Sequence, residues 1–300
     1  VRAGEERFVI FVPDALPGEE VEARIVSKKK NYGTAKVIRR ISESPLRTPP
    51  NCGAFGRCGG CQLQHISYDA QLELKRRTVF DALTRIGEIT NPNVLECVPS
   101  PQRWGCRNKA SLPAQSLRGE NLRAGFYRPR SHDIIPYSNC PVLLPKINQN
   151  LRELLAALRE EGFCGAKEGG RPQPHELIRH IVVRQAQFGE DSLCAVVGRR
   201  PLAKKEENKL RSIAEKIAGF SGMVYNINEA SGNFIWGSRT VSLFGEERMS
   251  EQLGRYKFTF EASSFFQVNS AQARNLYEYA SELALAGGAD RILELYSGVG

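Results

Sequence analysis

The sequence has no long hydrophobic run. No stretch of its 300 residues approaches the ~18 to 20 consecutive apolar residues that cross a bilayer, which excludes a membrane-spanning helix. The first residues, VRAGEERFVIFVPD, carry charges where a secretory signal peptide needs its apolar segment. We therefore expect a cytoplasmic protein with no membrane partner.

Histidine is scarce. The chain has four, and His132, His175 and His180 are isolated in the sequence, so we interpret each of them as structural. No grouping of residues between Val94 and Glu251 resembles a catalytic triad. The sequence alone therefore gives no indication of a hydrolase.

Positive charge, by contrast, is abundant. The 42 Lys and Arg residues outnumber the 33 Asp and Glu residues, and the resulting net charge of +9 favours a polyanionic partner such as nucleic acid. With 41% hydrophobic residues, a chain of this length can bury more than one core. We expect a globular protein of two or three domains.

Residues 1–48 have the pattern of a small β domain. Three strand-like runs, FVIFV, VEARIV and AKVIRRI, are separated by Pro/Gly and basic turns. Short strands on a short chain suggest an OB-like, five-stranded β-barrel with one strand lost upstream. The loop carrying Lys28, Lys29, Lys30 and Tyr32 suits RNA phosphates and bases, and a solvated hairpin tip is the alternative.

The middle of the chain predicts helices and strands in alternation. SYDAQLELKRRTVFDALTRIG indicates a helix capped by Ser67 and ended by Gly87, with an apolar stripe at helical spacing. Strand-like LIRHIVVRQA and LCAVVG alternate with helical INQNLRELLAALREEG and KKEENKLRSIAEKIAGF, which is typical of an α+β layer. Two segments, GCRNKASL and GFYRPRSHDI, mix basic and aromatic residues as single-stranded RNA requires; these are Arg107, Lys109, Phe126, Tyr127, Arg128 and Arg130.

The last segment indicates the beginning of a cofactor-binding sheet. SAQARNLYEYASELALAGG predicts a helix with Asn269 as N-cap and Gly287 as its end. RILELYSGVG then runs an apolar strand into a glycine turn, where a backbone can approach a nucleoside closely.

Three of the eight cysteines form a C-x5-C-x2-C cluster, Cys52, Cys58 and Cys61. Zinc sites usually contain two close pairs, whereas an iron–sulfur cluster accepts ligands spread along the chain and favours adjacent glycines such as Gly59 and Gly60. In SNCPV a proline follows the cysteine and gives a rigid turn. The candidates for a fourth thiolate are Cys97, Cys106, Cys140, Cys164 and Cys194, of which the last two have the context of small buried cysteines.

Four motifs in order, CGAFGRCGGCQLQH, SNCPV, SSFFQVN and ILELYSGVG, carry a family resemblance. The chain resembles the S-adenosylmethionine-dependent RNA (uracil-5-)-methyltransferases, specifically the 23S rRNA branch with a TRAM domain and a [4Fe-4S] cluster. The resemblance implies a multidomain fold: an OB-like TRAM β-barrel over 1–48, an α+β central domain over 49–63 and 94–255, and the start of an α/β Rossmann-like methyltransferase domain over 64–93 and 256–300.

The same resemblance implies the site residues. It makes Cys52, Cys58, Cys61 and Cys140 the ligands of the cluster, and it makes Phe265 or Phe266 a contact to RNA. Cys106 departs from the family, which more often has an aromatic residue before Arg-Asn-Lys. S-adenosylmethionine is expected to contact Gln267, Tyr296 and the turn from Gly298 to Gly300.

The implied reaction is methylation of uridine C5 through a covalent adduct. A cysteine thiolate adds to C6, C5 takes the methyl group from the sulfonium, and a base removes the C5 proton so that the thiolate can leave. The family places nucleophile and base beyond the first glycine loop, so we assign no catalytic residue to this chain. The chain begins without Met and stops in a glycine loop, and we expect this monomeric fragment alone to be inactive.

Other functions are compatible with parts of this pattern. A methylthiotransferase also combines TRAM, RNA and iron–sulfur chemistry, but its cluster needs C-x3-C-x2-C, which the spacing here does not match. A non-enzymatic RNA-binding protein with a structural zinc or iron–sulfur site is an alternative, and so is tRNA as the substrate.

Overall fold

The computed structural model describes residues 2–3, 8–116, 121–166, 175–230, 232–288 and 290–299. The chain divides into two compact units. Unit 1 contains Val1–Phe55 and Cys61–Pro99, and unit 2 contains Gly56–Gly60 and Ser100–Gly300. No helix in the described ranges is long and apolar enough to cross a membrane. The predicted division into three domains stays a prediction.

Unit 1 begins with a four-stranded sheet of order β1-β2-β4-β3. Its strands are β1 (Arg2–Ala3), β2 (Phe8–Phe11), β3 (Glu20–Lys28) and β4 (Tyr32–Ser42), which confirms the three predicted strands. β3 and β4 form an antiparallel hairpin, and β2 joins β4 in parallel. The predicted closed five-stranded barrel is not among these pairings and stays a prediction.

After the sheet, unit 1 contains helix α1 (Tyr68–Arg85). It follows Ser67, whose side chain makes no capping bond, and Gly87 donates its N–H to the Ala82 carbonyl at 3.0 Å. The predicted extent is confirmed, but no residue of the helix is buried, and Val79 remains 50% exposed. Helical spacing of apolar residues therefore predicted the helix and not the burial of its stripe.

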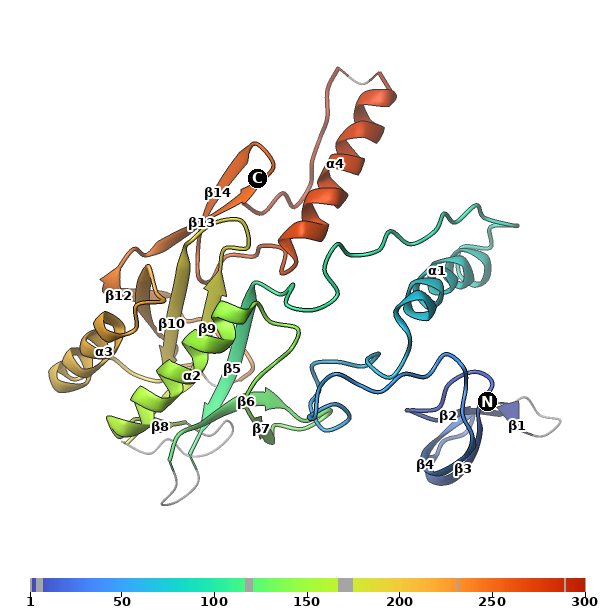
Figure 1. Ribbon diagram of the computed structural model, residues 1–300, viewed down its shortest axis with the longest axis horizontal. Coiled ribbons are helices and arrows are strands. Elements are labelled where there is room, and N and C mark those ends of the chain that lie inside the picture. The colour runs from blue at the N-terminus through green and yellow to red at the C-terminus, as the bar shows by residue number, and fades with distance from the viewer. Residues whose placement is uncertain are drawn as a thin grey trace. The chain divides into compact units, whose positions relative to one another are not determined.

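Unit 2 is built on a mixed sheet of eight strands (Figure 1). Its central path runs β12-β11-β10-β9-β5-β6-β7, with β8 paired to β9, and a separate hairpin joins β13 to β14. The bounds are β5 (Lys109–Gln115), β6 (Arg123–Tyr127), β7 (Ile134–Pro136), β8 (Cys164–Gly165), β9 (Glu176–Gln185), β10 (Ser192–Gly198), β11 (Gly222–Ile227), β12 (Arg239–Gly245), β13 (Arg248–Leu253) and β14 (Tyr256–Glu261).

One face of this sheet carries the main core. Helices α2 (Pro145–Glu160) and α3 (Lys204–Lys216) lie on that face (Figure 1). They pack against the sheet through apolar side chains such as Leu154 and Leu210. Alternate residues of the central strands, including Ile181 and Val196, face the helices because side chains along a strand point to opposite faces. The predicted helices are confirmed, and so is the predicted α+β layer of helices against a sheet.

The opposite face is covered differently. Val182, Ala195 and Val224 pack there against Phe260 and Phe266, which come from β14 and the loop after it. Helix α4 (Ser270–Ala286) follows, and the Asn269 side chain accepts the N–H of Gln272 at 3.1 Å, which confirms Asn269 as the N-cap. The sheet therefore has a helical face and a face that is covered in part by the β13–β14 hairpin.

Residues 290–299 differ from the sequence prediction. The run Arg291–Leu295 was expected to form a strand, but none is present there, and its apolar residues are exposed. Among the described residues no strand pairs with this segment, and an unpaired strand leaves its backbone N–H and C=O groups without ladder partners. The prediction of an ordered strand at this point was wrong.

Candidate nucleic-acid interface

The loop that follows β14 presents one aromatic side chain and buries the next. Phe265 is 74% exposed, whereas Phe266 is 5% exposed and stacks on Phe260 with ring centroids 4.4 Å apart. The sequence left open which of the two approaches RNA. Phe265 is therefore the exposed ring of the two and Phe266 is the anchor of the loop, and contact of Phe265 with RNA stays a prediction.

Asn108, just before β5, holds the backbone of this loop. Its amide donates to the carbonyl of Gln267 at 2.9 Å and to the Ser270 hydroxyl at 2.8 Å, and its backbone N–H donates to the carbonyl of Val268 at 2.8 Å. Ser270 in turn donates to the buried carboxylate of Glu251 at 2.7 Å. Gln267 therefore stands on a buried polar network that fixes its position.

Glu251 closes this network from β13. Its carboxylate accepts the backbone N–H groups of Gln187 and Phe188, both at 2.9 Å, and is 1% exposed. A buried carboxylate is stabilised by several donors of this kind. Sequence reasoning missed Asn108, Ser270 and Glu251 as positioning residues because nothing in their spacing shows that they meet.

Arg184 of β9 clamps the start of the same loop. Its guanidinium donates to the carbonyls of Ala262, at 3.0 Å, and Ser264, and lies 5.3 Å from the ring centroid of Phe260. Burial lowers the pKa of Arg184 to about 10. A buried cation thus takes two carbonyl oxygens as its partners, and the loop is tied to the sheet.

Lys109, a predicted RNA contact, is the residue directly opposite Arg184 in the β5–β9 ladder. Like charges at such a position repel. Burial, together with the positive charges of Arg184 and Arg107, lowers the pKa of Lys109 to about 8. Arg107 is exposed, and burial raises the pKa of the neighbouring Cys106 thiol. The structure therefore gathers Arg107, Lys109 and Arg184 beside the Phe265 loop.

The cofactor residues predicted at the end of the chain are not joined to Gln267. Tyr296 is fully exposed with φ +63°, and Gly298 has φ +67°. Among the described residues, no hydrogen bond or ring contact links either of them to Gln267. Gly300 lies outside the described residues. The role of all four in binding a cofactor stays a prediction.

The four predicted cluster ligands are half-buried cysteines. Cys52 and Cys61 belong to unit 1, and Cys58 and Cys140 to unit 2. Within the described ranges no group of three or more His, Cys, Asp or Glu side chains is arranged to hold a metal ion.

Cys58 and the glycines beside it have partly the predicted environment. The N–H of Gly60 donates to the Cys58 sulfur at 3.4 Å, as a thiolate ligand would require. Gly59 instead donates to the carbonyl of Tyr127 at 2.8 Å, and a side chain at Gly59 would come within 2.9 Å of that oxygen. Gly59 is therefore required for close contact with β6 and not for contact with sulfur.

Cys140 is held by a helix. Its backbone N–H donates to the side-chain carbonyl of Asn148 on α2 at 2.9 Å, and the Asn148 amide donates to the Cys140 carbonyl at 3.0 Å. Two bonds from one buried amide fix the turn that carries this sulfur. The iron–sulfur cluster itself stays a prediction.

The predicted basic loop of unit 1 lies at the end of the β3–β4 hairpin. Lys28, Lys29 and Lys30 are exposed, and Tyr32 is 44% exposed. The ammonium of Lys28 lies 5.5 Å from the centroid of the Phe8 ring, and Tyr32 meets Phe11 edge to face at 5.7 Å. The loop presents positive charge beside an exposed ring, and its contact with RNA stays a prediction.

The comparisons with known proteins agree with these features. Residues 5–38 match the TRAM domain, which confirms the predicted TRAM segment. The chain is 36% identical over 294 residues to an uncharacterized RNA methyltransferase of Halalkalibacterium halodurans, covering 98% of this chain and 63% of that protein. It is 34% identical over 299 residues to an uncharacterized RNA methyltransferase of Clostridium acetobutylicum, covering 98% and 64%. The chain thus spans less than two thirds of the length of these relatives.

A solved structure is also similar. The tRNA (uracil-54, C5)-methyltransferase of Pyrococcus abyssi, in complex with S-adenosyl-L-homocysteine, matches 94% of this chain and 64% of its own with a TM-score of 0.68 and 27% identity. These findings confirm the predicted similarity to RNA methyltransferases. They give no support to the expectation that this chain alone is inactive.

Proposed function

We propose that the protein methylates C5 of uridine in RNA, with S-adenosylmethionine as the methyl donor. The observation that carries the proposal is the Phe265 loop. An exposed aromatic ring stands there two residues before Gln267, on a backbone fixed by Asn108 and Arg184 and beside a cluster of positive charges. Stacking and phosphate pairing at one place are what a base taken out of an RNA strand requires.

The chain's own residues supply binding and orientation in this proposal. Phe265 stacks on a base, Arg107 and Lys109 pair with phosphates, and Gln267 contacts the cofactor together with Tyr296, Gly298 and Gly300. S-adenosylmethionine, when bound, supplies an electrophilic methyl group on a sulfonium. The relatives named as RNA methyltransferases and the similar structure bound to S-adenosyl-L-homocysteine support this donor.

The substrate is proposed to be 23S ribosomal RNA. The similar solved structure is named as a tRNA enzyme, so tRNA is the competing substrate. Mapping 5-methyluridine in both RNAs from a deletion strain separates the two. Loss from ribosomal RNA alone supports the proposal, and loss from tRNA alone contradicts the substrate.

The chemistry is tested by trapping. In an RNA that carries 5-fluorouridine at the target, C5 cannot lose a proton, so the C6 thioether should persist as a denaturation-resistant complex with the full-length enzyme. The control RNA carries uridine at the same position. No adduct with 5-fluorouridine RNA, under conditions that methylate the control, would contradict the covalent route at C5.

We also propose that Cys52, Cys58, Cys61 and Cys140 hold a [4Fe-4S] cluster with a structural role. Anaerobically purified protein should be brown and contain iron. Cys140→Ala should lose iron, and Cys97→Ala, the matched control, should keep it. Zinc in place of iron, or the reverse pattern between the two variants, would contradict the assignment and favour a structural zinc site.

A further inference from the structure

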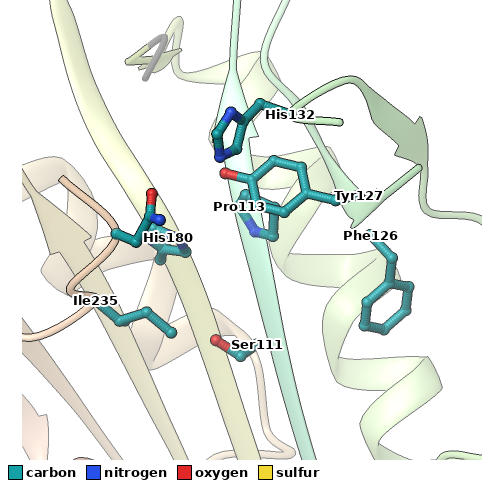
Figure 2. Close-up of a pocket in the computed structure, with 8 residues that line it drawn as sticks. Ser111, Pro113, Phe126, Tyr127, His132, His180 and Ile235 are labelled. Carbon is teal, nitrogen blue, oxygen red and sulfur yellow. The ribbon is translucent and has the colours of Figure 1, made fainter. Parts of the chain in front are cut away.

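A pocket lies on the sheet face opposite α2 and α3, beyond the part that the β13–β14 hairpin covers. Ser111 and Pro113 of β5 lie between two walls, with His180 and Ile235 on one side and Tyr127 and His132 on the other (Figure 2). This pocket has a volume of about 370 Å³; its remaining lining residues are Phe126 and Asn233. We call it the aromatic pocket.

A second hollow of about 550 Å³ continues from it. The two share Phe126, Tyr127 and His132, and the second is also lined by Gly59, Gly60 and the turn from Arg128 to Ser131. The Tyr127 and His132 rings meet edge to face with centroids 5.3 Å apart. A mainly apolar space is thus joined to one that two arginines border, and the described residues that line the two hollows include no acidic one.

The arginine turn is strained. Ser131 donates its N–H to the Arg128 carbonyl at 3.2 Å, with Pro129 second and Arg130 third in the turn. Arg130 has φ +57°, in the left-handed region that favours glycine at this position of a type II turn. A long side chain kept at a costly backbone conformation indicates a use for that side chain.

We propose that these two hollows bind one nucleotide of a single-stranded segment of the RNA substrate. The base enters the aromatic pocket and stacks on Tyr127, and its phosphate pairs with Arg128 and Arg130. This inference rests on the proposed function and adds a second nucleotide site to it, separate from the Phe265 loop.

The position of the pocket along β5 supports RNA over a free nucleotide. Lys109, Ser111 and Pro113 lie on the same face of the strand, because they alternate with the core residues Ala110 and Leu112. Four residues of strand separate Lys109 from Pro113 by about 13 Å. The face therefore runs from the positive charges beside Phe265 to the pocket, as a path for a continuous strand requires.

Two variants separate the base from the phosphate. Tyr127→Leu removes the stacking ring and keeps apolar bulk. Arg130→Gly removes a charge and relieves the backbone strain. Each is measured for binding to a labelled single-stranded RNA and to an oligomer of the same length that lacks bases.

Tyr127→Leu should weaken binding to the RNA by between about 5-fold and about 150-fold, the range for one stacked base, and leave binding to the abasic oligomer unchanged. Arg130→Gly should weaken binding to both and lower the slope of log affinity against log salt by about 0.7. Because glycine suits the left-handed conformation, the same variant should unfold at the wild-type temperature or above it. A merely structural arginine would show the opposite combination, namely lower stability with unchanged salt slope.

RNA that contains 4-thiouridine should crosslink to the segment from Phe126 to His132. The proposal is wrong if the wild-type chain binds no RNA, if both variants bind like wild type, or if uridine monophosphate alone competes as well as the oligomer. Crosslinking at Tyr127 by the full-length protein, if that protein forms no 5-methyluridine, would overturn the proposed function and leave this site standing.

Discussion

Replacing Lys109 with methionine should make unit 2 more stable and its binding to RNA weaker. Lys109 stands opposite Arg184 in the sheet, and both are positively charged. No carboxylate is among the groups that shift its pKa, which falls from 10.5 to about 8 through burial and through the charges of Arg184 and Arg107. Methionine has a similar length and no charge, so the variant removes the repulsion and keeps the packing.

The expected gain follows from the pKa. A pKa that falls from 10.5 to about 8 costs the charged form about 3 kcal/mol, at about 1.4 kcal/mol per pKa unit. Lys109 is only partly buried, and screening by solvent reduces this to about 1 to 2 kcal/mol. Since the folded pKa lies below the unfolded one, the penalty is fully present below pH 8 and disappears as the pH rises to 10.5.

The assay is urea unfolding of wild type and variant at several pH values. Lys109→Met should be more stable by about 1 to 2 kcal/mol at pH 7, with a difference that shrinks toward pH 10. Lys205→Met, an exposed lysine on α3, is the matched control and should show neither effect. A variant less stable than wild type at pH 7, or a difference that does not change with pH, would refute the reasoning. The salt slope of RNA binding should fall by about 0.7.

Two further predictions concern other parts of the chain. The side-chain hydrogen bond from Arg47 lowers the pKa of Glu19 from 4.5 to about 2, so the carboxylate's contribution to stability should be present above pH 4.5 and lost as the pH falls toward 2. Glu19→Gln should therefore lower the free energy of unfolding by about 3 kcal/mol at pH 7, measured by chemical denaturation. A variant that loses stability in acid as wild type does would contradict this. Phe266→Ala should cost about 3 to 5 kcal/mol of stability, whereas Phe265→Ala should cost almost none and weaken RNA binding by about 1 to 3 kcal/mol. Calorimetry measures the stability and a binding titration measures the affinity. If Phe265→Ala lowers stability more than Phe266→Ala and leaves RNA binding unchanged, the exposed ring is not the RNA contact.

The helices of unit 2 could be predicted from sequence because each carries its own local signals. Apolar residues at helical spacing gave α2 and α3, and Asn269 and Gly287 marked the two ends of α4. The central strands β9 and β10 were apparent as β-branched runs. Local propensity and pattern agreed with the tertiary structure in these segments, which is why the predictions were confirmed.

Local sequence signals failed where the structure of a segment depends on a neighbouring segment that is distant in the sequence. The run Arg291–Leu295 has the composition of a strand, yet a strand exists only when another lies beside it. The network of Asn108, Ser270 and Glu251 joins residues more than a hundred positions apart, and no spacing rule finds such contacts. The sequence indicated the chemistry of Arg128 and Arg130 but not the pocket beside them.

Two destabilising features, a pair of like charges and a strained backbone, lie on the same side of unit 2, and this supports one common binding function for them. Lys109 and Arg184 place like charges opposite each other on the sheet face opposite α2 and α3, and Arg130 keeps a strained backbone at the pocket farther along. Selection for stability alone would remove both, since a neutral residue at 109 and glycine at 130 are single substitutions that relieve them. A polyanion bound along that face compensates both destabilising features, because phosphates that pair with Lys109 and Arg130 supply negative charges that the free protein lacks there.

If the two sites bind one RNA strand, combining Lys109→Met with Arg130→Gly should lower the slope of log affinity against log salt by about 1.4, twice the effect of either variant. The stability gains of the two variants should add. A double variant whose salt slope matches that of one single variant would mean that only one of the two side chains meets a phosphate.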